Sequence, residues 1–170
     1  MSSDHGAVDM HEGIAVRVAI VAENASARFG GEAILPLHYF RFLRQRGVPV
    51  WLVANARNRA ELSQTVSAAD FSHIQFVEDR PIYRPLSHAF LHWKNPIVVL
   101  PAGLLLKWLA AGEQRRILRR LVRECGVNVV HQPIPVSPKA VSFIYGVGAP
   151  VVIGPMNGAI HGLSRRICAF

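Results

Sequence analysis

Cysteine, long apolar runs and acidic residues are all scarce in this chain of 170 residues. Its two cysteines, Cys125 and Cys168, form no C-x-x-C pair, so we expect no disulfide framework and a reduced, cytoplasmic setting. The most apolar run, residues 97–111, is interrupted by proline, glycine and lysine. A membrane-spanning helix needs about 20 predominantly apolar residues. The sequence therefore predicts no membrane-spanning segment.

Acidic residues are outnumbered by basic ones, 11 against 19, for a formal net charge of +8. Residues 1–12 contain three acidic residues, Asp4, Asp9 and Glu12, and no lysine or arginine, so residues 13–170 carry a net charge of +11. Such a surplus suits nucleic acid, an anionic membrane surface or a phosphorylated ligand, and it equally suits solvated helix faces. No nucleic-acid recognition motif is present, so we expect no nucleic-acid partner.

Hydrophobic residues make up 51% of the chain and charged residues 18%. That apolar content is enough for one compact domain, whereas the length is too short for two full domains. We expect one domain over residues 14–160, a disordered leader over residues 1–13 and an atypical tail over residues 161–170. The leader is polar and acidic, unlike a secretory signal.

Apolar strands alternate with amphipathic helices along the domain. Strands are expected at residues 16–22, 48–54, 74–77, 127–130 and 151–153. Helices are expected at residues 32–46, within 55–69, at 101–124 and at 138–145. This alternation predicts an α/β fold, a Rossmann-like parallel sheet with helices on both faces.

Ligands of such sheets bind at the carboxyl ends of the strands, so the segments after the strands are the first candidates for a site. Gly30 and Gly31 follow the first strand and open a helix. Glycine lets a ligand approach the backbone, and a helix N-terminus offers free N–H groups to a phosphate. The same pair also suits a tight turn that needs positive φ.

His131 and Gln132 follow the fourth strand. An imidazole there can donate to an oxygen of a ligand or exchange a proton near neutral pH. Alternatively, it is a strand-end histidine bonded to a backbone carbonyl. Lys139 begins the next helix and either faces the same crevice or is solvated.

Several familiar motifs are missing. The first strand does not lead directly into G-x-G-x-x-G, and no G-x-x-x-x-G-K-[ST] loop exists, so nicotinamide and P-loop chemistry are disfavoured. His88 and His92 stand four residues apart, but a metal site needs a third ligand, and we expect no metal. The basic helix at residues 115–123 either packs on the sheet with a solvated rim or contacts anionic lipid.

Four segments, taken in order, resemble the N-terminal half of family 4 glycosyltransferases, which have the GT-B fold. They are RVAIVAENASARFGGEAILPLHYFRFL at residues 17–43, VWLVANARNRAEL at 50–62, VNVVHQPIPVSPK at 127–139 and GAPVVIGPMNG at 148–158. The resemblance therefore covers nearly the whole chain. It depends on the order and spacing of the Gly-Gly pair and the His-x-Pro segment, since each is a modest signal alone.

The resemblance implies transfer of a sugar, with retention, from a nucleotide-sugar donor to a lipid-linked or polysaccharide-precursor acceptor, without a metal or other cofactor. It implies that Gly30 and Gly31 lie against the donor diphosphate and that His131 is the catalytic residue near the transferred sugar. It implies acceptor-binding roles for Arg28, Glu32, Gln132, Lys139 and Asn157. Many relatives act at membranes, so we expect a cytoplasmic protein that is peripheral on the inner membrane face.

The family's second Rossmann-like domain, which carries most nucleotide-sugar contacts and an E-x7-E motif, has no counterpart in this sequence. The final strands of the first domain also lack one. We therefore expect a truncated or split product that is inactive alone, exposes apolar surface and has the missing domain as a partner chain. The alternative hypothesis is a non-catalytic α/β binding module that associates with an anionic membrane or a protein partner.

Overall fold

The computed structural model describes residues 15–28, 30–78, 96–137 and 140–156. At its centre is a five-stranded, all-parallel sheet in the order β3-β2-β1-β4-β5. The strands are β1 (Val18–Val21), β2 (Val50–Asn55), β3 (Ile74–Val77), β4 (Val129–Gln132) and β5 (Val151–Ile153). The predicted α/β, Rossmann-like fold is confirmed, while the predicted leader and tail lie outside the described residues.

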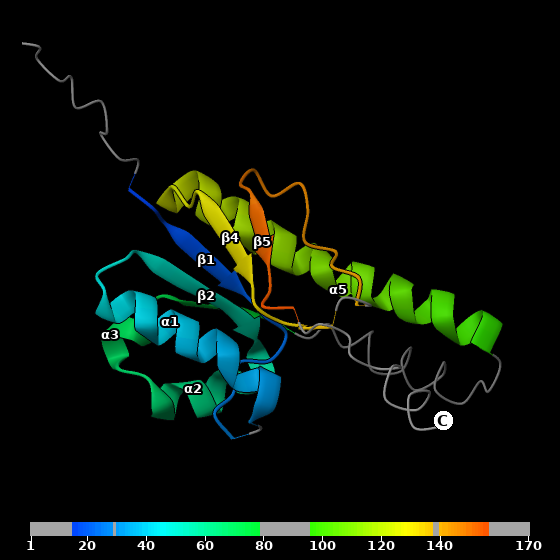
Figure 1. Ribbon diagram of the computed structural model, residues 1–170, viewed down its shortest axis with the longest axis horizontal. Helices are drawn as coiled ribbons and strands as arrows, with labels where there is room; N and C mark the ends of the chain where they lie inside the picture. The colour runs from blue at the N-terminus through cyan, green and yellow to red at the C-terminus, as the bar shows by residue number, and fades with distance from the viewer. Residues whose placement is uncertain (1–14, 29, 79–95, 138–139, 157–170) are drawn as a thin grey trace, which may run out of the picture.

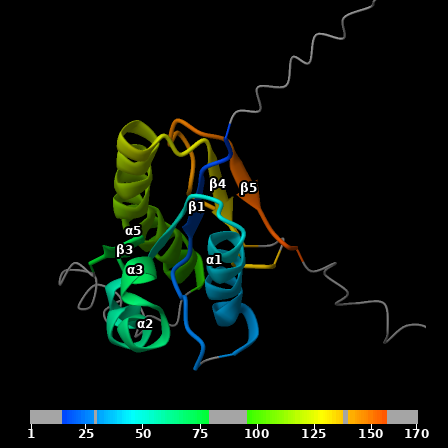
Figure 2. The same cartoon turned by 90° about the vertical axis from the view of Figure 1, so that its left-hand side faces the viewer.

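Helices cover both faces of this sheet (Figure 1). They are η1 (Gly31–Ile34), α1 (Leu35–Gln45), η2 (Ala56–Asn58), α2 (Arg59–Thr65), α3 (Ala68–Phe71) and α5 (Pro96–Cys125). Figure 2 shows the sheet between α1 on one side and α5 on the other. Pro36 lies in the first turn of α1, where its missing N–H leaves no helical hydrogen bond unmade.

The core has two halves because side chains alternate along each strand. Ile20 of β1 lies in the half on the α1 side, together with Leu37 and Phe40 of α1. Val21 lies in the half on the α5 side, together with Leu118 of α5. All four residues of β1 are buried, which explains why the strand reads as an unbroken apolar run.

The fourth strand extends further than its pattern indicated. The sequence predicted a strand that ends at Val130, but β4 continues through His131 and Gln132, which pair with Ile20 of β1 and Ile153 of β5. Val130 is buried in the core on the α5 side. The alternation of side chains therefore places His131 on the α1 face and Gln132 on the α5 face of the sheet.

The helix predicted over residues 138–145 is wrong, because its described part is irregular. The carbonyl of Phe143 accepts a hydrogen bond from Arg115 Nη1 at 3.0 Å. The carbonyl of Gly146 accepts one from Arg119 Nε at 2.9 Å. Arginine side chains of α5 thus provide the hydrogen-bond donors for these carbonyls of the irregular segment.

α5 has 30 residues and begins before the predicted start of its helix. Leu118 and Leu121 in its second half are buried, as predicted. Its first half extends past the end of the sheet (Figure 1), and there Leu105 and Trp108 are exposed. Among the described residues, no helix combines the length and the apolar content that crossing a membrane requires.

β5 forms one edge of the sheet, with β4 as its described neighbour. Val152 and Ile153 of β5 have exposed fractions of 52% and 40%. An exposed apolar surface was expected, and this edge strand provides part of it. Exposed strand edges favour association with other chains.

The two phenylalanines of α1 allow a matched test of the core. Phe40 is fully buried and Phe42 is 48% exposed. We expect Phe40→Ala to lower the free energy of unfolding by about 3–5 kcal/mol, because it leaves a cavity, and Phe42→Ala to lower it by less than about 1 kcal/mol. Urea unfolding followed by circular dichroism measures both. Equal losses would contradict the assignment of the core.

Candidate functional site

The order of the strands locates the crevice of this sheet. β1 lies between β2 and β4, so the chain leaves β1 toward one side of the sheet and later returns on the other side. In open parallel sheets, ligands bind where the connections diverge in this way, at the carboxyl ends of the two strands. Here that point lies between the ends of β1 and β4.

A cavity of about 350 Å³ lies at this point, within the size range of small-molecule sites. Its apolar lining includes Val21 at the end of β1, Ala111 of α5 and Phe143 of the irregular segment. Its polar lining consists of Glu23, Asn24, Glu32, Lys107, Gln114 and Gln132. We call this cavity the β1–β4 cleft.

Two of the predicted acceptor residues, Glu32 and Gln132, line the β1–β4 cleft. Glu32 comes from the segment after β1, and its Oε2 accepts a hydrogen bond from the amide of Val136 after β4, at 3.4 Å. Gln132 comes from β4, and its Oε1 accepts a hydrogen bond from the Ser142 hydroxyl at 2.6 Å. The segments that follow β1 and β4 are thus joined beside the cleft.

Gly30 and Gly31 form a turn of the kind that glycine adopts most readily. Their φ values are +60° and +54°, and the ψ of Gly30 is −165°, a combination that is nearly restricted to glycine. A Cβ at either position would meet no atom within 4 Å. The structure therefore shows the tight turn with positive φ that was one of two interpretations of this pair, and phosphate binding at these glycines stays a prediction.

His131 does not line the β1–β4 cleft. Its Nε2 lies 2.8 Å from the carbonyl oxygen of Gly154 after β5. Its ring meets Tyr39 of α1 edge-to-face, with the ring centroids 4.9 Å apart. This contact matches the alternative of a strand-end histidine bonded to a backbone carbonyl. The catalytic role of His131 stays a prediction that turnover has to decide.

The loop after β1 is held by Glu61 of α2, a residue that the sequence did not single out. The Glu61 carboxylate accepts hydrogen bonds from the Ser26 hydroxyl at 2.7 Å and from the amides of Ala27 and Arg28 at 2.8 and 3.1 Å. The side chain of Arg28 reaches Gln64 of the same helix at 3.5 Å and does not line the cleft. An acidic residue early in the helix after the second strand is the signal that could have revealed this contact.

These contacts govern the charge of Glu61. Partial burial alone would raise the pKa of Glu61. Hydrogen bonds from the Ser26 hydroxyl and from the amides of Arg28 and Ala27, together with the charge of Arg28, outweigh that effect, so the pKa lies below its usual value. The carboxylate is therefore the form that holds the loop.

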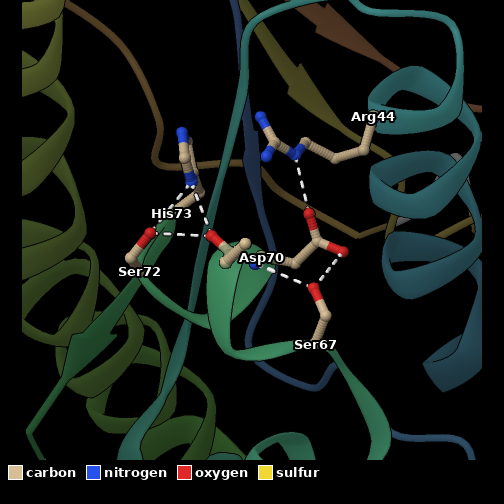
Figure 3. Close-up of polar contacts among 6 residues, drawn as sticks. Arg44, Ser67, Asp70, Ser72 and His73 are labelled. Carbon is tan, nitrogen blue, oxygen red and sulfur yellow. Dashed lines mark hydrogen bonds and ion pairs between the residues drawn. The ribbon is translucent and has the colours of Figure 1, made fainter.

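A second polar cluster connects α1 with α3 (Figure 3). Arg44 Nε donates a hydrogen bond to Asp70 Oδ1 at 2.8 Å. At the start of α3, the Ser67 hydroxyl oxygen accepts a hydrogen bond from the Asp70 amide at 3.1 Å. The hydrogen bond from Arg44 is the main reason why the pKa of Asp70 is lowered. His73 lies beside the cluster, with its Nδ1 3.2 Å from the Ser72 hydroxyl. These contacts join two helices and lie outside the β1–β4 cleft.

Three arginines of α5 contact the rest of the protein. Arg115 is only 8% exposed, and its guanidinium lies 5.4 Å from the ring centroid of Trp108 and 4.8 Å from that of Tyr145. Arg119 donates to a backbone carbonyl and Arg120 donates to a glutamine of β3. The basic helix thus packs on the sheet through its apolar stripe, and these side chains add tertiary contacts.

Some residues named from the sequence lie outside the described residues. They are Lys139 and Asn157 of the predicted acceptor set, and His88 and His92. Within the described ranges, no group of three or more His, Cys, Asp or Glu residues is arranged to hold a metal ion. The β1–β4 cleft is therefore built from Glu32, Gln132 and residues that the sequence did not single out.

Glu61→Gln tests the contact that holds the loop. We expect the variant to lose about 1 kcal/mol of stability at neutral pH, allowing for solvent screening, and its Ala27 and Arg28 amides to exchange hydrogen faster. The folded pKa of Glu61 lies below the unfolded value, so its stabilisation is present above the unfolded pKa and is lost as the pH falls through the folded pKa. Urea unfolding at decreasing pH should therefore show the two proteins converging in acid.

Glu124→Gln is the matched control for this measurement. Glu124 is exposed near the end of α5, and its carboxylate lies 3.9 Å from Arg120 on the same helix. Exposed pairs of this kind contribute little to stability, so we expect almost no change at any pH. A loss of equal size in both variants would show that the carboxylate of Glu61 has no special role.

Comparisons of this chain with protein-family models, with curated proteins and with solved structures give no match. The parallel α/β fold and the β1–β4 cleft come from the structure alone. The resemblance to family 4 glycosyltransferases stays a prediction that rests on the residues at the strand ends.

Proposed function

We propose that this chain is the acceptor-side domain of a retaining glycosyltransferase that uses a nucleotide-sugar donor. The observation that carries the proposal is the β1–β4 cleft at the point where the strand connections diverge. Glu32, next to the glycine turn, lines the cleft together with Gln132 of β4. The glycine turn after β1 and the His-x-Pro segment at the end of β4 occur along the chain in the order that the resemblance implies.

In this proposal, the glycine turn receives the diphosphate of the donor. The open space beside Gly30 and Gly31 lets phosphate oxygens approach backbone amides, which stabilise the charge that develops on the leaving diphosphate. The bond between the anomeric carbon and the diphosphate breaks, and a bond to an acceptor hydroxyl oxygen forms with retained configuration. The proton of that hydroxyl leaves to the diphosphate.

The acceptor occupies the β1–β4 cleft. The carboxylate of Glu32 and the amide oxygens of Gln114 and Gln132 accept hydrogen bonds from hydroxyl groups, and the amide nitrogens donate to hydroxyl oxygens. Val21 and Phe143, which also line the cleft, supply apolar contacts to the faces of a sugar ring. A cleft of this mixed character suits a molecule rich in hydroxyl groups.

The nucleotide of the donor needs a second protein surface. The resemblance assigns most of the nucleotide contacts to a second Rossmann-like domain that faces the glycine turn. We therefore propose that this chain acts together with such a domain, in the same protein or as a partner chain, and that it is inactive by itself. The proposed transfer uses no metal and no cofactor besides the donor substrate.

A second candidate function is binding to an anionic membrane without catalysis. Leu105, Trp108 and Tyr145 have exposed fractions of 53%, 41% and 54%. Lys107 is an exposed cation on the same part of α5, and Arg116 has an 82% exposed side chain. Apolar, aromatic and basic residues in this combination are typical of surfaces that lie on anionic lipid. Only the first candidate predicts transfer of a sugar, so a transfer assay separates the two.

The first test supplies the missing nucleotide surface. The chain is titrated with UDP-glucose and GDP-mannose in a calorimeter, alone and after fusion to the C-terminal domain of a family 4 glycosyltransferase. We expect no measurable heat from the chain alone, and donor binding together with transfer of a labelled sugar to a glycan from the fusion. Strong donor binding by the isolated chain, or a folded fusion that binds the donor and transfers no sugar, would contradict the proposal.

Two glycine variants sharpen this test. In the fusion, Gly30→Ala places a Cβ beside the proposed diphosphate, whereas Gly47→Ala makes the same change at the end of α1. Both glycines have positive φ, +60° and +73°, with no atom within 4 Å of an added Cβ, so neither variant adds a steric clash. The ψ of Gly30, −165°, makes an alanine there costly for the backbone, and thermal unfolding of both fusions measures this cost separately from donor binding. We expect only Gly30→Ala to weaken donor binding.

His131→Ala in the same fusion tests the catalytic assignment. We expect turnover to fall by about 100-fold, while the midpoint of thermal unfolding changes little. His73→Ala is the control, because His73, like His131, lies outside the cleft and is hydrogen-bonded, but it belongs to the polar cluster near α3 and not to the end of β4. Unchanged turnover with reduced stability would show instead that His131 only holds the carbonyl of Gly154.

A further inference from the structure

A second cavity adjoins the β1–β4 cleft. It has a volume of about 170 Å³, and Glu23 and Gln114 line both cavities. Its other polar lining includes Asn55 at the end of β2, Glu78 after β3 and Glu113 of α5. The two cavities therefore follow one another along the carboxyl edge of the sheet, from β4 across β1 to β2 and β3. We call the pair the edge groove.

Carboxylates and amides dominate the polar lining of the edge groove, although the chain carries a net charge of +8. In the β1–β4 cleft, two glutamates and three amide side chains stand against one cation, Lys107. In the second cavity, three glutamates and two amide side chains stand against Arg57. Counted over the lining residues alone, the groove is thus net negative in a protein that is net positive.

Two arginines pair with glutamates of the second cavity: Arg59 Nη2 lies 2.5 Å from Glu78, and Arg116 Nη1 lies 4.0 Å from Glu113. Two other cations have their contacts outside the groove. Arg28 reaches Gln64 of α2, and Arg115 lies over the rings of Trp108 and Tyr145. A phosphate group in the groove would therefore lie beside carboxylates, and Arg59 and Arg116, the arginines nearest to two of them, are already engaged in ion pairs. Sugar hydroxyls, in contrast, donate to carboxylates and exchange hydrogen bonds with amides without any charge to balance.

We infer that the acceptor is an uncharged oligosaccharide of at least two sugar units, which binds along the edge groove. Glu23 and Gln114, which line both cavities, lie where the two sugar units meet. The inference rests on the proposed function and names the acceptor class of that same site. The sugar with the reacting hydroxyl occupies the β1–β4 cleft beside Glu32, and the next sugar occupies the second cavity. An acceptor whose first recognised group is a lipid phosphate does not fit this lining.

The inference is tested on the chain by saturation-transfer NMR. The probes are neutral trisaccharides of glucose, mannose and galactose, the three monosaccharides, and their 1-phosphates. We expect at least one trisaccharide to bind about tenfold more tightly than its monosaccharide, because the second cavity adds contacts, and the phosphates to bind most weakly. Tighter binding of a phosphate than of every trisaccharide, or no binding by any trisaccharide, would overturn the inference.

Glu23→Ala tests the contact that the two cavities share. We expect it to raise the Kd of the bound trisaccharide by about tenfold, since one charged hydrogen-bond acceptor is lost. Glu124→Ala, an exposed change at the end of α5 about 15 Å along the helix from Gln114, should leave that Kd unchanged. An equal effect of the two variants would also count against the inference.

The outcomes separate this inference from the proposed function. Trisaccharide binding by the chain together with a fusion that transfers no sugar would end the glycosyltransferase proposal and leave the edge groove as a glycan-binding site. Transfer by the fusion to a phosphorylated acceptor, and to no neutral glycan, would end this inference and leave the proposed function in place.

Discussion

The burial of β1 between two parallel neighbours is the constraint on which the rest of the structure depends. Val18 pairs with Val50 of β2 and with Val129 of β4, and both faces of the strand are covered by helices. A strand that is apolar on both faces is stable only in the interior of a sheet. Because β1 is central, the chain diverges at its carboxyl end, and this divergence brings Glu23 beside Gln132 in one cleft.

The walls of that cleft are irregular segments, and charged side chains from the helices hold them. Glu61 of α2 binds two amides of the loop after β1. Arg115 and Arg119 of α5 bind carbonyls of the irregular segment before β5. Backbone groups outside helices and strands need partners, and here side chains provide them. Part of the arginine surplus therefore has a structural role, while the edge groove itself is lined by acidic and amide groups.

The apolar periodicity predicted the elements of the fold more successfully than their ends. It located β3 at Ile74–Val77, but it ended the fourth strand at Val130, since the polar His131 and Gln132 break the apolar run. These two residues still belong to β4, because backbone hydrogen bonds to β1 and β5 do not depend on side-chain polarity. These two additional strand positions determine which side chain lines the cleft, because they place the His131 imidazole and the Gln132 amide on opposite faces of the sheet.

The sequence alone determined the α/β class, the two-sided burial of the central strands and the positive-φ turn at Gly30 and Gly31, because each follows from local pattern or from backbone sterics. Only the tertiary structure decided which polar residues share the cleft. Glu23, Lys107 and Gln132 come from segments far apart in the sequence, and the order of strands in the sheet, which no local pattern encodes, brings them together. The same long-range packing made Glu61 a partner of the loop after β1, a contact that requires the two elements to be neighbours in space.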